Sequence, residues 1–72
     1  MTPCPKAAEL SQSLSEILAH IVDLTKAQLD AFQENRESEM MRLDKELENA
    51  IGKKERAIGA LREHRREHHC AA

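Results

Sequence analysis

Aromatic side chains are almost absent from this 72-residue sequence: Phe32 is the single one, and there is no Trp or Tyr. A core must therefore be built from Leu, Ile, Ala and Met. Glycine and proline number two each, so the turn clusters that a β or α/β domain requires are missing. One third of the residues are charged. This profile of helix-forming residues with few breakers is typical of long helices or a coiled coil.

Long apolar runs and a strong charge imbalance are also missing. No run of about 18 apolar residues occurs, which excludes a membrane-spanning helix, and the segment Met1–Lys6 has no apolar signal-peptide core. Eleven basic and 13 acidic residues give a net charge of −2, which favours neither nucleic acid nor membrane as a partner. Two cysteines near the chain ends do not form the framework of a small secreted domain. We therefore expect a cytoplasmic protein.

What the sequence does contain is a seven-residue rhythm of apolar residues in each half. Alternating spacings of three and four predict two a/d seams of a coiled coil. The first seam consists of Ala7, Leu10, Leu14, Ile17, Ile21, Leu24, Gln28 and Ala31, and the second of Met40, Leu43, Leu47, Ala50, Lys54, Ala57 and Leu61. The polar members Gln28 and Lys54 can fix register and partner choice, although Lys54 can also extend its charge to the surface along its own stem.

The join between the seams predicts a reversal of the chain. Ala31 and Met40 are nine residues apart, which would put the seams on opposite sides of one straight helix. Residues whose numbers sum to 71 pair all seven seam levels, so we expect an antiparallel hairpin in a single domain, 1–72. Helix 1 is predicted over about 5–34, the turn over 35–37 and helix 2 over 38–69. Asn35 tolerates the left-handed conformation, and Ser38 can cap the second helix; one uninterrupted helix is the alternative.

More apolar residues are present than one hairpin seam requires. Flanking e positions hold Leu18, Phe32, Ile51 and Ile58, which widen the apolar face in the manner of helices that pack against a third and fourth helix. We predict that two hairpins form a four-helix bundle as a homodimer; the alternative is that this face receives a helix of another protein. The apolar residues at b positions lie outside both stripes: Val22, Leu29 and Met41.

The open end of the predicted hairpin carries the residues with metal or redox chemistry. His64 and His68 are four apart and share one helix face, a spacing that can bind a metal ion. With Cys4 and Cys70 they make a set of the zinc type, while the two thiols alone could form a disulfide. The third interpretation is that the Cys and His residues at the chain ends have neither function, because terminal residues fray.

Patterns that mark enzymes are missing: the chain has no Glu-x-x-His pair, no His-Glu-x-x-His and no phosphate-binding glycine loop. Gly52 and Gly59 lie on outer f positions, where they indicate either an unconstrained surface or close approach of another backbone. A basic excess over residues 53–69 lacks aromatic residues for stacking on nucleic acid. We expect a non-catalytic interaction or assembly module, adaptor-like or chaperone-like; the alternative is a metal- or redox-responsive helical protein.

Overall fold

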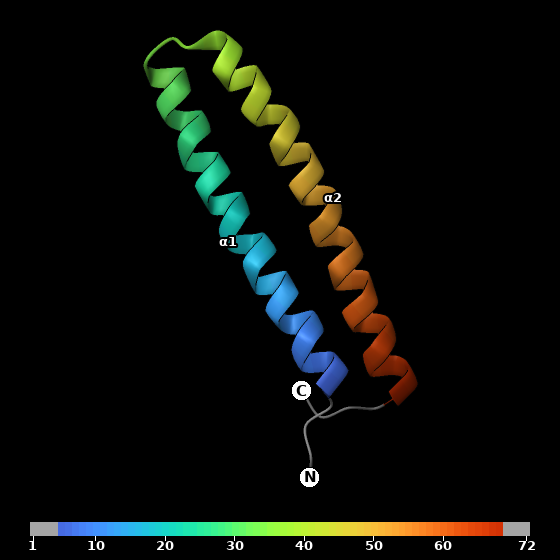
Figure 1. Cartoon of the computed structure of the whole chain (residues 1–72). Coiled ribbons are helices and arrows are strands. Elements are labelled where there is room, and N and C mark those ends of the chain that lie inside the picture. Colours follow the sequence, from blue (N-terminus) through green and yellow to red (C-terminus); the bar gives the residue numbers. More distant parts are fainter. Residues whose placement is uncertain (1–4, 69–72) are drawn as a thin grey trace.

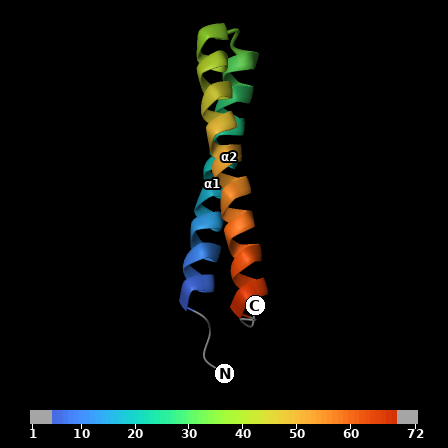
Figure 2. The same ribbon diagram turned by 90° about the vertical axis from the view of Figure 1, so that its right-hand side faces the viewer.

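Two long helices joined by a short bend form the computed structural model, which describes residues 5–68 (Figure 1). Helix α1 spans Pro5–Gln33 and α2 spans Glu37–His68. The helices run antiparallel and stay side by side from the bend to the open end (Figures 1 and 2). The Cα atoms extend over 53 × 17 × 11 Å. The predicted all-α hairpin is confirmed, and the alternative of one uninterrupted helix is wrong.

The bend is a Schellman motif at the end of α1. The amide of Arg36 donates to the carbonyl of Ala31 at 2.8 Å, and the amide of Asn35 donates to the carbonyl of Phe32 at 3.2 Å. These two bonds satisfy carbonyl groups that the end of a helix otherwise leaves without a partner. Asn35 has a φ of 57°, the left-handed conformation that this motif requires and that asparagine tolerates better than most residues.

Helix α2 begins at Glu37, directly after Arg36, the last residue of this motif. The amide of Met40 donates to the carbonyl of Arg36 at 3.0 Å, which makes Arg36 the N-cap residue. The prediction that Ser38 caps α2 is wrong, because Ser38 lies inside the first turn. Arginine offers no side-chain acceptor to the free amides there, so α2 relies on Glu37 and Glu39, whose negative charges suit a helix N-terminus.

The core is one layer of side chains between the two helices. Its most buried members lie in the half nearer the bend: Leu24, Ala31, Leu43 and Ala50. Leu61 is the buried residue nearer the open end. The remaining residues of both seams are half-buried, because a pair of helices covers each seam from one side only. A core this thin leaves a 72-residue chain with little stability as a monomer.

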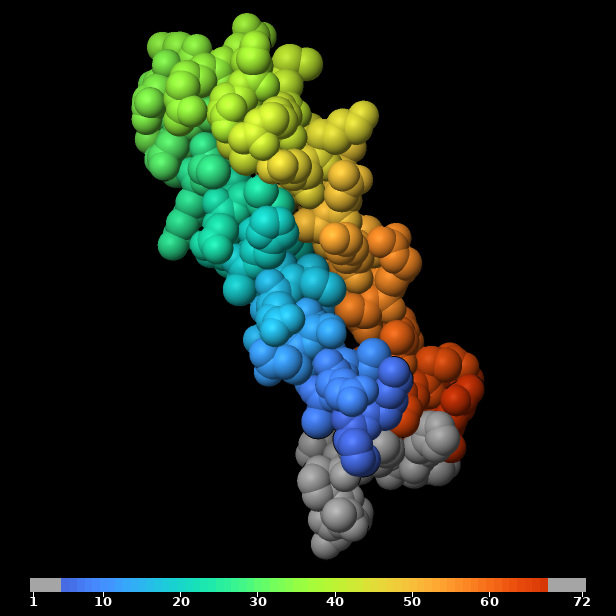
Figure 3. Space-filling view, viewed as in Figure 1, coloured from blue at the N-terminus to red at the C-terminus, as the bar shows by residue number. Residues whose placement is uncertain are grey.

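Hydrogen bonds from Gln28 show how the two helices are aligned along their length. Its Nε2 donates to the Met40 carbonyl at 3.5 Å and to Asp44 Oδ1 at 3.3 Å, so Gln28 lies level with the middle of that turn, near Leu43. This is the level that pairing by a sum of 71 assigns to it. The space-filling view shows the two helices in contact as one narrow rod (Figure 3).

Candidate interaction surface

The two broad sides of the hairpin differ in chemistry. One side has a shallow groove of about 410 Å³ between the helices, formed by g and c positions together with the edge of the seam. Most of its lining is polar or charged, and it consists of Ser13, Glu16, Ile17, His20, Glu46, Asn49, Ala50 and Lys53. Because e and b positions lie across the helix from g and c positions, they occupy the other broad side.

We call that other side the e/b face: its α1 half is uncharged, whereas on its α2 half the apolar Met41, Ile51 and Ile58 alternate with charged residues. Its large side chains are strongly exposed: Leu18 44%, Val22 51%, Leu29 54%, Phe32 65%, Met41 66% and Ile51 37%. Ile58, which we predicted as part of the same surface, is half-buried beside the seam. Isolated apolar residues on a surface are ordinary, whereas several large exposed ones on one face make that face a candidate interaction surface.

Sequence reasoning missed the contribution of the b positions. Val22 is four residues from Leu18, and Leu29 is three residues from Phe32, so each pair shares one side of α1. The signal was present in these spacings. Val22 and Leu29 widen the exposed apolar surface along the outer edge of α1, and Met41 does the same on α2.

Helix α1 carries no charge on the e/b face. All of its e and b positions are apolar or small and uncharged: Ala8, Ser11, Ser15, Leu18, Val22, Thr25, Leu29 and Phe32. The Thr25 hydroxyl donates to the Ile21 carbonyl at 2.8 Å, so it needs no outside partner. The acidic residues of α1 instead repeat every seven residues on c positions, at Glu9, Glu16, Asp23 and Asp30. On α1, therefore, the acidic residues are separated from the e/b face.

A second hollow lies beside the bend. It has a volume of about 270 Å³ and is lined by Ala31, Phe32, Asn35, Arg36, Glu37 and Met40. The side chain of Phe32 borders this hollow and is among the most exposed apolar groups of the described chain. The lining of this hollow therefore combines the apolar Ala31, Phe32 and Met40 with the polar Asn35, Arg36 and Glu37.

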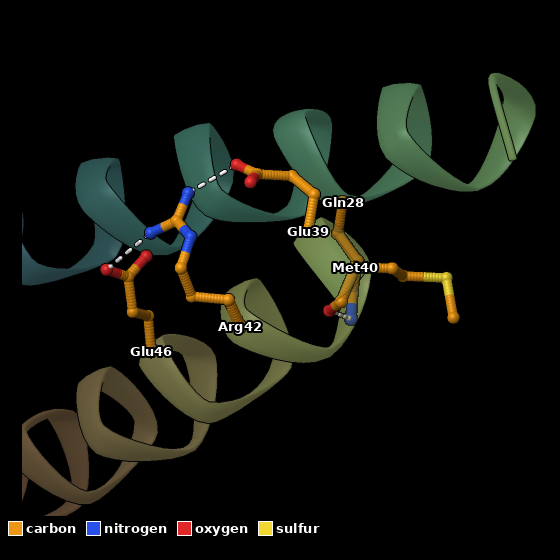
Figure 4. Close-up of polar contacts among 5 residues, drawn as sticks. All are labelled: Gln28, Glu39, Met40, Arg42 and Glu46. Atoms are coloured by element: carbon orange, nitrogen blue, oxygen red, sulfur yellow. Dashed lines mark hydrogen bonds and ion pairs between the residues drawn. The ribbon is translucent and has the colours of Figure 1, made fainter. Parts of the chain in front are cut away.

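Two kinds of polar contact lie near the bend: ion pairs within α2 and hydrogen bonds from Gln28 on α1 to α2. Figure 4 shows Arg42 between Glu39 and Glu46, with Gln28 reaching across from α1 to the Met40 carbonyl. Arg42 donates to Glu39, and its Nη1 donates to Glu46 Oε1 at 3.1 Å. The hydrogen bond from Arg42 holds the pKa of Glu39 below its ordinary value, and the pairing with Glu39 raises the pKa of Arg42. Exposed pairs of this kind stabilise a helix only weakly.

The predicted metal or disulfide site is largely outside the described residues. Cys4 and Cys70 both lie beyond residues 5–68, and the side chain of His68 is also outside the description. His64 is half-buried on α2. Within residues 5–68 no three His, Cys, Asp or Glu side chains come close enough together to hold a metal ion. Zinc binding and a Cys4–Cys70 disulfide stay predictions.

Comparisons with known proteins identify no relative of this chain. The chain matches no family model, and neither curated proteins nor solved structures give a significant match. In the part of the chain that the structure describes, neither α1 nor α2 combines the length and apolar character needed to cross a membrane. The surface chemistry of the hairpin itself is therefore the basis for any functional argument.

Proposed function

We propose that this chain is a non-catalytic assembly module that works by burying its e/b face against the same face of a second copy, which gives a four-helix bundle. The observation that carries the proposal is the composition of this face. Six large apolar side chains are exposed there, and the α1 half bears no charge. A hairpin that worked alone would keep this surface in contact with water, at a cost in solubility.

The energetics support association. Full burial of a Leu, Ile or Val side chain contributes about 1.5–3 kcal/mol, and Leu18, Val22 and Ile51 still have between 37% and 51% of their surface left to bury. Symmetry doubles every such contribution, because each residue acts once in each chain. The sum is set against the loss of translational and rotational freedom, which costs roughly 4–15 kcal/mol. Since the monomer core is thin, folding and association reinforce each other.

Insertion of a single charge into the e/b face tests the proposal. We expect sedimentation velocity to give a dimer for the wild type and a monomer for Leu18→Glu or Ile51→Glu, since a carboxylate buried in an apolar interface costs several kcal/mol. The matched control is Ala19→Glu, an exposed f position next to Leu18 that points away from the face. It should remain a dimer. A wild type that is monomeric, or a control that dissociates like Leu18→Glu, contradicts the proposal.

A further inference from the structure

The e/b face has two gradients along its length, one of size and one of charge. On α1 the residues near the open end are small, namely Ala8, Ser11 and Ser15, whereas those nearer the bend are larger, namely Leu18, Val22, Thr25, Leu29 and Phe32. On α2 the charged residues of the face are acidic from the bend to just past the middle, at Glu37, Asp44, Glu48 and Glu55, and basic toward the open end, at Arg62 and Arg65. A partner that fits this surface must present both gradients in reverse.

We infer that the partner on this face is a second copy of the chain in the antiparallel orientation, with the two bends at opposite ends of the bundle. This inference rests on the proposed function and adds the orientation and register of the two copies. The two-fold axis runs across the helices, so that α1 packs on α1 of the other copy and α2 packs on α2. Because the two copies run in opposite directions, the small residues of one α1 then face the large residues of the other, and the acidic part of one α2 faces the basic part of the other.

One axis position satisfies both gradients at once. On α2, an axis close to Glu55 places Asp44 level with Arg65 of the other copy, Glu48 level with Arg62, and Ile51 level with Ile58. The hairpin register, in which level residues sum to 71, puts the same axis between Ile17 and Glu16 on α1. There, Leu18 meets Ser15, Val22 meets Ser11 and Thr25 meets Ala8. Large side chains thus pack on small ones in α1 while opposite charges meet in α2. The like pair of Glu55 residues beside the axis is an unfavourable contact of this arrangement.

The alternative two-fold axis runs along the helices and fits less well. It keeps both bends at one end and sets α1 of each copy against α2 of the other. The charges of Asp44, Glu48 and Arg62 would then face the uncharged residues of α1 and would gain no opposite charge. Moving a charge onto apolar surface without a partner is costly, so the charge pattern disfavours this orientation.

The size of the contact is sufficient for a specific dimer. With the axis at this level, about 24 residues of each α1 overlap, a length of about 36 Å at 1.5 Å per residue. The hairpin is 17 Å wide, so the projected contact is on the order of 1,200 Å² for both chains together, the lower end of the range for stable specific interfaces. Leu29 and Phe32 then lie beyond the overlap of the two α1 helices, toward the ends of the bundle, and Met41 lies at the end of the α2 overlap.

A distance between spin labels distinguishes the two orientations. The full chain carries Cys4→Ser and Cys70→Ser to remove its own thiols, and Gln33→Cys, an exposed f position beside the bend, for labelling. In the antiparallel dimer the labels lie about 16 residues on either side of the axis, so pulsed electron-spin measurements should give about 50 Å. In the parallel dimer both labels lie at the same end, within roughly 30 Å. The shorter distance in a dimeric sample overturns the orientation while association stands. A monomeric sample overturns both.

Charge reversal gives a second test that does not depend on labels. Arg62→Glu should weaken dimerisation roughly tenfold, because it disrupts two symmetry-related pairs, and adding Glu48→Arg should restore affinity to within about threefold of the wild type. Lys45→Glu, on the outer f side of α2 and exposed, is the matched control and should have an effect below threefold. Equal effects of Arg62→Glu and Lys45→Glu, or no recovery in the double variant, would overturn the antiparallel pairing.

Discussion

Substitution of Asn35 by glycine should leave the hairpin as stable as before or make it more stable, by up to about 1 kcal/mol. Asn35 has a φ of 57°, and an L-residue in the left-handed region costs roughly 1–2 kcal/mol, less for asparagine, whose short side chain bonds locally. Glycine removes this cost. Its greater conformational freedom in the unfolded chain, however, lowers the stability of the folded chain by about 0.5–1 kcal/mol. The net change is therefore small and favourable. Asn35→Val, with a β-branched side chain at the same φ, should lose at least about 1–2 kcal/mol.

A glycine substitution at a regular helical position is the control, because there the change in unfolding free energy should have the opposite sign. Ala19 is exposed in the middle of α1, so Ala19→Gly should cost about 1 kcal/mol, the ordinary difference between these residues in a helix. The free energy of unfolding is measured by urea denaturation followed by circular dichroism, at one protein concentration for all variants because association contributes to stability. If Asn35→Gly destabilises the chain as much as Ala19→Gly does, residue 35 is in a regular helix and the description of the bend is wrong.

Three further changes address other parts of the structure. Gly59→Ala should raise the unfolding free energy by about 1 kcal/mol in a urea titration, because a Cβ atom at Gly59 would meet nothing within 4 Å; a loss of stability would instead indicate a backbone packed against it. Gln28→Leu should stabilise the hairpin by about 1 kcal/mol, since its hydrogen bonds of 3.3 and 3.5 Å are long and weak; destabilisation would show that they matter more than packing. NMR titration should find a higher pKa for Glu39 in Arg42→Gln than in the wild type. Because the folded-state pKa of Glu39 lies below its ordinary value of 4.5, its stabilising contribution is complete above that pH and disappears as the pH falls through the lowered pKa. An unchanged pKa in the variant would contradict the role assigned to Arg42.

The hairpin could be predicted because the spacing of the apolar residues requires the chain to reverse. The nine-residue step from Ala31 to Met40 is incompatible with one seam on one helix, and Asn35 marks the reversal because few other side chains accept its conformation. Both arguments need only the geometry of a single helix, and the confirmed fold agrees with them.

The details of the bend and of the surface could not be predicted in the same way. Ser38 is a preferred N-cap residue, yet the Schellman motif ends α1 so close to α2 that Arg36 accepts the first hydrogen bond of α2, from the amide of Met40. The short turn therefore overrides the preference of Ser38. The grouping of Val22 with Leu18 was predictable from their spacing of four, but the heptad labels separated them. The metal and thiol residues at Cys4 and Cys70 involve positions beyond the described residues, where neither argument applies.

The central claim is that the e/b face is buried between two copies of this chain. Sedimentation equilibrium of the wild type, over about a hundredfold range of protein concentration, tests it most directly. We expect the fitted mass to approach twice the 8.2 kDa of one chain as the concentration rises, with no larger species. A mass of 8.2 kDa at every concentration, from a sample that circular dichroism shows to be helical, would contradict the claim.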